Sequence, residues 1–554
     1  MKSTKYVILF YFLLFTFLYF FTLNFNYVEG DDAATILYHL CGRNSEIQTP
    51  YASYNSGLDF LIKISNLKGE VPLRTFAVSV SFISGFLVLS LLVLFLDTFF
   101  ERTQIINDKN KVYLYILLPF IVPDMIFHSL IINSTSISFV FLLSSLIVFI
   151  KFLMTNQIKF LLLSTLFFAI AIPFRWTTLT AMPLYMGLAL YYNPIQEYSK
   201  NTWWLFLKII VANLAGVFLA IVFIDVTGYN IFDIYNTIIA TTGYLENSER
   251  SILSILATAS AFLTPSLLFL VFLSIFKIIE LNKKQPKFGL SIGSLLLLSI
   301  SPFFIVGFFP SFKFLITIFP MILIIILLGF DYLVRSKSLL IIFFVLLVGS
   351  WIIGVQLDVK GTFSGPGFEL NTQKSINSNK SQDNNPDTRI KIDKINFKFD
   401  SGFYLPMLEG PRPLYGYFYV LFADGWKNQI NLFTQEREKI FEYLVKNKNA
   451  VYIQDRKTAY FQCDLYRKGL ATQTNFLESK NDSYRNFKNQ NISINVHVIP
   501  ENNIKMEWIT NYLKETKSPV IYRSSYSSEI LKLYENKENK IEVLGPFTAI
   551  KKVD

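Results

Sequence analysis

Long apolar runs separated by short polar segments cover the first 357 residues of the chain. A helix of about 20 apolar residues is long enough to cross a lipid bilayer. The pattern therefore predicts about eleven transmembrane helices within residues 1–357. They fall near residues 6–25, 73–97, 112–132, 135–153, 158–173, 175–192, 203–226, 252–280, 289–308, 312–333 and 338–357.

The pattern changes after about residue 358, where polar positions become frequent. Residues 371–387 form a polar, low-complexity segment that predicts a loop or linker. Beyond it, strands alternate with helices, which predicts a small α/β domain over residues 358–554. That domain contains no glycine-rich phosphate loop, so we assign it no nucleotide-binding role. Its expected helices are 435–447 and 527–536, and its expected strands are 450–454, 492–499, 519–522 and 541–544.

Composition supports a membrane protein. Of 554 residues, 52% are hydrophobic and only 16% are charged, against roughly 25% charged in soluble domains. The net charge of +11 does not indicate nucleic-acid binding, because the basic residues are scattered between apolar spans. Two cysteines and three histidines support neither a disulfide framework nor a His-rich metal centre.

Lysine and arginine concentrate in alternate loops. Cytoplasmic loops carry this excess in membrane proteins, so we expect a cytoplasmic N-terminus. An odd number of spans then places the chain after about residue 358 outside the cytoplasm, together with external loops at 26–72 and 227–251. The loop residues are Arg102, Lys109, Lys111, Lys151, Lys159, Lys200, Lys283, Lys284, Lys287, Arg335 and Lys337.

An acidic stretch, Glu29-Gly30-Asp31-Asp32, directly follows the first span. Carboxylates at a membrane exit are costly to desolvate and cannot act as a cytoplasmic anchor. Asp31 and Asp32 are well placed to take a proton from an acceptor beside a lipid-borne donor. A solvated acidic loop explains the same residues.

Basic residues also occur on the expected outer face, where the topology rule does not require them. A phosphate or diphosphate headgroup would account for them, since arginine offers paired donors and lysine a point charge. Snorkelling towards lipid headgroups is the alternative explanation. The residues concerned are Arg43, Lys63, Arg74, Arg175 and Lys313.

The first external loop also contains candidates for an acceptor site or cavity, namely Tyr51, Tyr54 and Asn55. They precede an amphipathic run over residues 58–67, which predicts a short helix lying on the membrane surface above the acidic pair. Asp124 and His128 lie near the external end of the third span. A buried histidine at such a position also serves as an interhelical hydrogen bonder.

These features together resemble the GT-C superfamily of polyprenyl-phosphate-sugar-dependent glycosyltransferases. The layout is most similar to bacterial relatives of protein O-mannosyltransferases and of lipid A aminoarabinose transferases. Asp31-Asp32 matches the acidic motif after the first helix, and residues 50–58 resemble the aromatic and proline stretch that follows. Arg74 matches an arginine at the start of the second helix. Lys313-Phe314 stands where the family often has Arg-Tyr, ahead of Pro320.

The resemblance implies a GT-C-like catalytic domain over residues 1–357 and an extracytoplasmic C-terminal domain in the bacterial inner membrane. It implies sugar transfer, with inversion, from a polyprenyl-phosphate donor to a glycan, lipid or protein acceptor. The first acid of the pair, Asp31, would be the general base, although Asp32 stands where many members carry Glu. Cations would stabilise the leaving phosphate: Arg74, Arg175, Lys313 and Arg43.

The sequence identifies no certain cofactor for this reaction, and a need for a divalent metal is left open. Asp31, Asp32 and Asp124 could hold a divalent metal, but three carboxylates without histidine are a weak signature. Two alternatives remain open: an O-antigen type polymerase or ligase, and a lipid-linked sugar flippase or transporter. The first usually carries its long external loop between late helices, and the second tends to show internal repeats, which this chain lacks.

Overall fold

The computed structural model describes most of the apolar part of the chain and short segments of the rest. The described residues are 2–21, 56–68, 70–101, 106, 108–130, 134–192, 200–227, 264–285, 288–306, 317–352, 355–362, 391–399, 442–443, 446–447, 450–454, 496–500, 514, 519–523, 539–544 and 547–552. They fall into two compact units, one formed by the helices with strands β1 and β2, the other containing strands β3 to β7.

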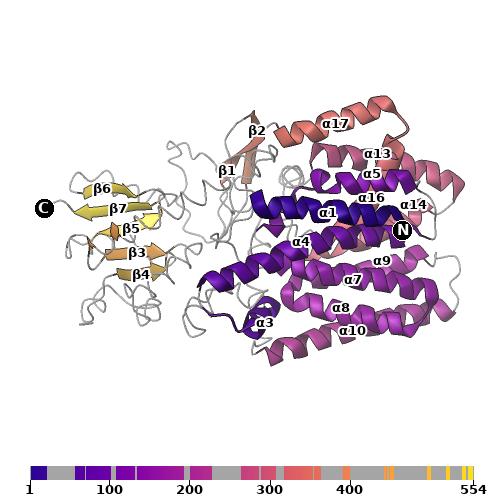
Figure 1. Cartoon of the computed structure of the whole chain (residues 1–554), viewed down its shortest axis with the longest axis horizontal. Coiled ribbons are helices and arrows are strands. Elements are labelled where there is room, and N and C mark those ends of the chain that lie inside the picture. Colours follow the sequence, from indigo (N-terminus) through magenta and orange to yellow (C-terminus); the bar gives the residue numbers. More distant parts are fainter. Residues whose placement is uncertain are drawn as a thin grey trace. The chain divides into compact units, whose positions relative to one another are not determined.

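The first unit is a bundle of α-helices (Figure 1) that follows the predicted apolar runs. Within the described residues, five helical segments are long and apolar enough to cross a membrane: Thr4–Phe21, Val71–Phe100, Ser134–Thr155, Trp203–Val226 and Pro265–Lys284. The chain is therefore a helical membrane protein. Its helices are α1 (Lys2–Phe21), α3 (Ser56–Ser65), α4 (Glu70–Phe100), α5 (Asp108–Ile121), α6 (Asp124–Ser129), α7 (Ser134–Thr155), α8 (Ile158–Phe174), α9 (Met182–Tyr192), α10 (Lys200–Val226), α13 (Pro265–Lys284), α14 (Phe288–Val306), α16 (Phe319–Leu333) and α17 (Lys337–Ile352).

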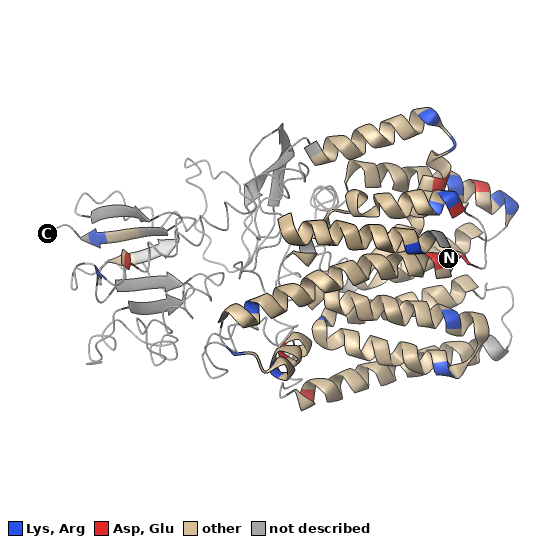
Figure 2. Ribbon diagram, in the orientation of Figure 1, with Lys and Arg blue, Asp and Glu red and all other residues tan. Residues whose placement is uncertain are grey.

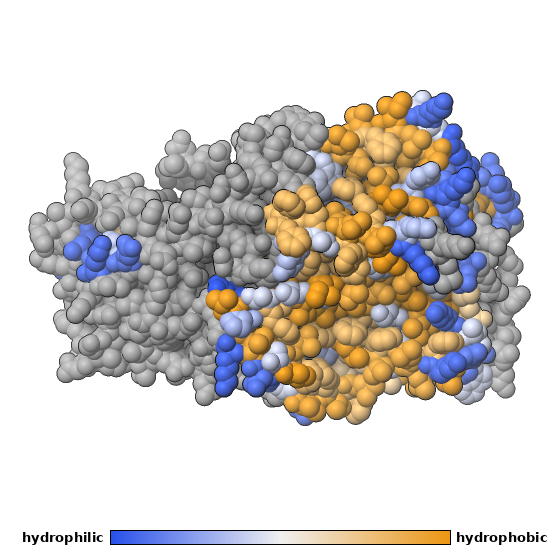
Figure 3. Space-filling view, viewed as in Figure 1, coloured by the Kyte–Doolittle hydropathy of each residue, from blue (hydrophilic) through white to orange (hydrophobic). Residues whose placement is uncertain are grey.

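The outer surface of this unit is apolar, as Figure 3 shows for one face. Many of its exposed side chains are large and hydrophobic, among them Phe12 on α1, Phe218 on α10 and Val345 on α17. Water would solvate such a surface poorly, whereas lipid chains match it. The exposed helix faces therefore form a lipid-facing surface.

Successive long helices run in alternate directions, so the bundle has two distinct ends. At one end, Thr4 at the start of α1 bonds Asp97 near the end of α4. We call this the basic end, because most of the lysines and arginines gather there (Figure 2). The other end contains a 3-10 helix, η3 (Trp176–Ala181), and we call it the η3 end.

Three predicted spans differ from the structure, each for a local reason. The span expected at 112–132 is divided into α5 and α6 around Pro123, because proline lacks an N–H and disfavours helix before it. The span expected at 175–192 consists of η3 and α9. The last span ends at Ile352, and the chain from Val355 forms a strand instead of continuing to residue 357.

Helix packing inside the bundle uses small and hydroxyl-bearing residues, as is typical of membrane interiors. Ser145 and Ser164 bond each other's carbonyl oxygens at 2.7 and 3.0 Å, which joins α7 to α8. The Tyr185 hydroxyl of α9 lies 2.7 Å from the Ser145 hydroxyl. Between α13 and α16, a methyl group at Gly329 would overlap the Leu270 carbonyl. Only glycine allows this close approach.

Two groups of strands complete the described chain. In the first unit, β1 (Val355–Thr362) pairs with β2 (Lys391–Phe399) as an antiparallel hairpin that the sequence pattern did not predict. The boundary expected after residue 357 falls inside β1. In the second unit, five strands form one sheet in the order β4-β3-β5-β7-β6. They are β3 (Ala450–Gln454), β4 (Val496–Pro500), β5 (Val520–Arg523), β6 (Asn539–Leu544) and β7 (Phe547–Lys552).

This sheet is mixed. Strand β3 pairs in parallel with β4 and β5, whereas β7 pairs antiparallel with β5 and β6. The four strands expected in this region are confirmed within a few residues, and β7 is an additional one. The polar segment 371–387 and the helix expected at 527–536 lie outside the described residues. In the helix expected at 435–447, Glu442 and Tyr443 are described, and both are helical.

Candidate functional site

Arg175 stands at a break in the chain at the η3 end. Helix α8 has Pro173 in its last turn and ends at Phe174. Arg175 is then extended (φ −156°, ψ 111°), and its backbone N–H donates to the carbonyls of Ala171 and Ile172. The bulky and β-branched run that follows has low α-helix propensity, and it forms a tight 3-10 turn. Arg175 at this break is only 7% exposed.

Hydrogen bonds hold the η3 segment firmly against its neighbours. Ser138 of α7 donates to the Ala171 carbonyl at 2.9 Å. Its hydroxyl proton is therefore used, so the Thr178 hydroxyl, 2.7 Å away, donates to Ser138. On the other side, the hydroxyls of Thr180 and Thr317 lie 2.9 Å apart. The backbone that carries Arg175 is thus fixed by three separate contacts.

Two polar atoms of the same segment have no hydrogen-bond partner in the part of the chain that the structure describes. They are the indole N–H of Trp176 and the hydroxyl of Thr177, and both atoms are buried. Trp176 as a whole is 7% exposed. Buried polar groups are nearly always paired. The segment next to Arg175 therefore presents unused hydrogen-bonding capacity inside the protein.

Helix α3 packs beside this segment. Ser56 donates to the Pro173 carbonyl at 3.2 Å, and Gly57 lies so close to Phe174 that a methyl there would come within 2.8 Å of the ring. Its expected place on the membrane surface stays a prediction, but the short helix expected near residues 58–67 is confirmed. It links the end of α8 to the start of the bundle's next element, α4, which it also contacts.

A buried carboxylate on α3 was missed by the sequence reasoning. Asp59 is 0% exposed and pairs with Lys63 at 3.2 Å, one helical turn away. The Lys63 ammonium also donates to the Thr227 carbonyl at 2.9 Å, just after the last residue of α10. A cation is favoured at that position by the partial negative charge of a helix C-terminus. The sequence predicted Lys63 only as an outward cation. In the structure it links α3 to the end of α10.

The structure places two of the predicted phosphate-binding residues. Arg74 lies in the first turns of α4 and is partly buried, and Arg175 lies at the end of α8. Both belong to the η3 end of the bundle. Asp124 and His128 are placed on α6 as backbone only. The remaining predicted residues lie outside the described part: Asp31, Asp32, Arg43, Tyr51, Tyr54, Asn55 and Lys313.

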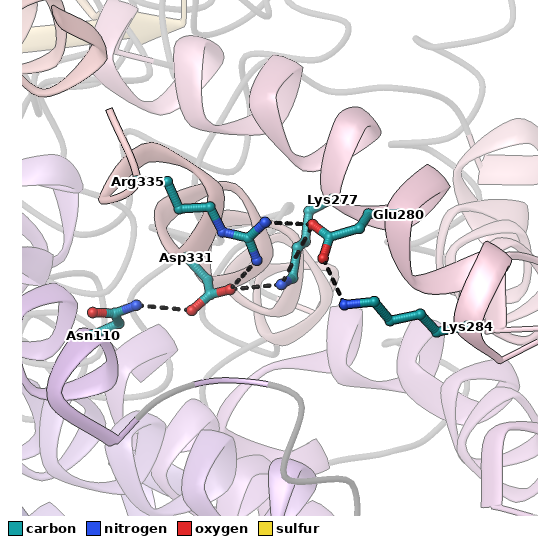
Figure 4. Close-up of polar contacts among 6 residues, drawn as sticks. All are labelled: Asn110, Lys277, Glu280, Lys284, Asp331 and Arg335. Atoms are coloured by element: carbon teal, nitrogen blue, oxygen red, sulfur yellow. Dashed lines mark hydrogen bonds and ion pairs between the residues drawn. The ribbon is translucent and has the colours of Figure 1, made fainter. Parts of the chain in front are cut away.

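A second polar cluster, at the basic end, joins three helices (Figure 4). The Lys277 ammonium lies 2.7 Å from the Asp331 carboxylate, and both side chains are more than nine-tenths buried. Asn110 donates to the other oxygen of Asp331 at 2.8 Å. Arg335 bonds Glu280 at 2.6 Å and approaches Asp331 at 3.5 Å. The network therefore connects α5, α13 and the end of α16.

Both carboxylates of this basic-end cluster are neutralised by its cations. Lys284 bonds the second oxygen of Glu280 at 3.0 Å, so each carboxylate has several donors. Burial lowers the pKa of Arg335, but its hydrogen bond and charge contacts with Glu280 and Asp331 outweigh burial and raise it. Carboxylates with this many cationic partners are poor proton acceptors. We therefore regard the cluster as a structural link and not as a catalytic site.

Metal binding finds no support in the described part of the chain. No group of three or more His, Cys, Asp or Glu side chains comes together there. The carboxylates named above as possible ligands, Asp31 and Asp32, lie outside that part, and only the backbone of Asp124 is described.

Comparison with known proteins adds no relative to these observations. No protein-family model matches the chain, and neither the curated proteins nor the solved structures contain a match.

Proposed function

We propose that this protein is a membrane glycosyltransferase that takes a sugar from a polyprenyl-phosphate carrier. The acceptor is a glycan, a lipid or a protein, and transfer occurs on the extracytoplasmic face. The observation that carries the proposal is Arg175, a cation 7% exposed at the bundle end where few other described residues are basic (Figure 2). Its position suits an anionic group delivered within the membrane.

The proposal includes a complete topology. Eleven helical spans would run between the two ends, with η3 and α9 together forming one of them. The basic end would face the cytoplasm, in keeping with the lysine and arginine excess in Figure 2. The η3 end and the C-terminal α/β domain would then be extracytoplasmic, and the sheet of β3 to β7 would belong to that domain.

The proposed reaction uses the acids and cations that the sequence singled out. As the acceptor oxygen attacks the anomeric carbon, Asp31 takes the acceptor's proton, with Asp32 as the alternative base. The bond between the anomeric carbon and the phosphate oxygen breaks, and the phosphate leaves with the electron pair. Arg175 and Arg74, with Lys313, stabilise the negative charge that grows on this oxygen. Arginine suits the role because it remains charged and binds two phosphate oxygens at once.

Turnover of purified protein in lipid nanodiscs tests the proposal. Radiolabelled undecaprenyl-phosphate hexoses and pentoses serve as donors, and membrane extracts supply the acceptor. We expect transfer by the wild type and none by the Asp31→Asn, Asp32→Asn double variant. Arg175→Gln should reduce kcat by about 100-fold or more, since it removes a charge that acts on the leaving group.

Lys151→Gln is the matched control, because Lys151 is an exposed cation at the basic end. It should leave turnover unchanged. Full activity of the double aspartate variant contradicts the proposed mechanism. Movement of the labelled lipid across the bilayer without sugar transfer would instead identify a flippase.

A further inference from the structure

The indole N–H of Trp176 is a buried donor that nothing in the described structure accepts from. Indole nitrogen can only donate, so its need can be met only by an acceptor. Leaving such a group unpaired in a protein interior is costly, and native structures rarely tolerate it. This donor belongs to the residue that follows Arg175 in the chain, and its unused N–H calls for a chemical explanation.

Loose packing does not explain the unpaired donor. Its neighbour Arg175 is anchored through its backbone N–H to two carbonyls. Two residues later, Thr178 is buried and bonded through Ser138 to the α8 backbone. The backbone is thus anchored on both sides of Trp176, while the indole N–H and the neighbouring Thr177 hydroxyl stay unused in the described structure.

The neighbouring groups define which acceptor fits. A guanidinium, like an indole N–H, donates hydrogen bonds and accepts none. A ligand oxygen that binds both donors must satisfy two conditions. It must accept hydrogen bonds, and it should carry negative charge, because Arg175 is positive. A phosphate oxygen meets both conditions, whereas a sugar hydroxyl meets only the first.

We propose that Trp176 is a binding residue for the phosphate of a prenyl-phosphate ligand, with its indole N–H donating to a phosphate oxygen beside Arg175. This inference rests on the proposed function for the identity of the lipid. It adds a neutral, directional donor to the cations expected from the sequence. Such a donor favours a bound oxygen in one position, which a flexible cation alone does not.

Binding of farnesyl phosphate to purified protein in detergent tests this inference by isothermal titration calorimetry. The decisive variant is Trp176→Phe, which keeps an aromatic ring and removes the N–H. We expect its Kd to rise at least about tenfold, the effect of losing one hydrogen bond to a charged group. The control is Trp203→Phe, because Trp203 is 72% exposed on α10, and its Kd should match the wild type.

A second substitution guards against misfolding. Incorporation of 3-benzothienylalanine at position 176 keeps the bicyclic shape and replaces the N–H with sulfur. It should weaken binding as Trp176→Phe does. Farnesol, which lacks the phosphate, should bind equally to all forms. Inorganic phosphate forms a separate arm: if it binds as tightly as farnesyl phosphate and is weakened equally by the same variants, the site is one for free phosphate, contrary to the proposed lipid ligand.

Two results overturn the inference. One is unchanged farnesyl phosphate affinity in both position-176 variants, and the other is no binding of farnesyl phosphate by the wild type. Sugar transfer is measured separately. A protein that binds farnesyl phosphate through Trp176 but transfers no sugar would refute the glycosyltransferase and leave the phosphate-binding role standing.

Discussion

The buried ion pair between Lys277 and Asp331 makes a quantitative prediction about stability. At 2.7 Å and an effective dielectric constant of about 20, the attraction is about 6 kcal/mol. Desolvation of both ions offsets much of it. Removing one partner, however, leaves an uncompensated buried charge and typically costs about 3–5 kcal/mol. Lys277→Met should therefore destabilise the protein by about 3 kcal/mol, because Asn110 and Arg335 still contact Asp331.

The chain offers a matched control on the same helix. Lys284 bonds Glu280 at 3.0 Å, but its side chain is 69% exposed. An exposed pair typically contributes only about 0.2–1 kcal/mol. Lys284→Met should thus have a small effect, although it makes the same chemical change seven residues away. Reversible unfolding in mixed SDS micelles, followed by tryptophan fluorescence, measures both free energies.

A double variant separates loss of attraction from the cost of a buried charge. In Lys277→Met, Asp331→Leu, no carboxylate remains unpaired in the interior, so much of the lost stability should return. Equal effects of Lys277→Met and Lys284→Met would refute the reasoning. Equal effects would mean that water reaches Asp331 and screens its negative charge. The structure predicts otherwise, because the Asp331 side chain is only 7% exposed.

Two further predictions concern packing and topology. Gly329→Ala should destabilise by about 1–3 kcal/mol in the same assay because its methyl meets the Leu270 carbonyl. Gly293→Ala, with open space around its methyl, should be neutral or stabilising by up to about 1 kcal/mol; an equal loss at both glycines would count against the close helix approach. In a cysteine-free background, Lys68→Cys should react with a membrane-impermeant maleimide in intact cells, and Lys283→Cys only after permeabilisation. The reverse labelling would overturn the proposed orientation.

Much of the helical unit could be predicted from apolar run length. Bilayer thickness sets the length of a spanning helix, and α4, α7 and α10 follow the predicted runs within a few residues. The prediction failed where a local rule overrode the apolar signal. Pro123 divides one run, and the segment after Arg175 tightens into η3. Neither change ends the surrounding apolar run, so run length could not detect it.

The candidate site was predictable only as a set of residue types. Arg74 and Arg175 could be recognised because cations on the expected outer face have no topological purpose. Asp59 carried a weak signal, an acid four residues before Lys63 in an amphipathic run. Trp176 carried none, because an aromatic residue at a helix end is an ordinary membrane feature. Its significance comes from an unpaired N–H, which depends on every neighbouring atom.

Sequence alone determined that the chain enters a membrane as helices and that its basic residues gather at one end. Both properties are sums over many residues, and each residue contributes through transfer between water and lipid, whatever its neighbours. Tertiary structure alone decided which polar groups meet. Lys277 and Asp331 are 54 positions apart, and their pairing needs α13 and α16 to pack closely at Gly329. Hydrogen bonds and ion pairs act over about 3 Å, so their partners are chosen by packing and not by composition.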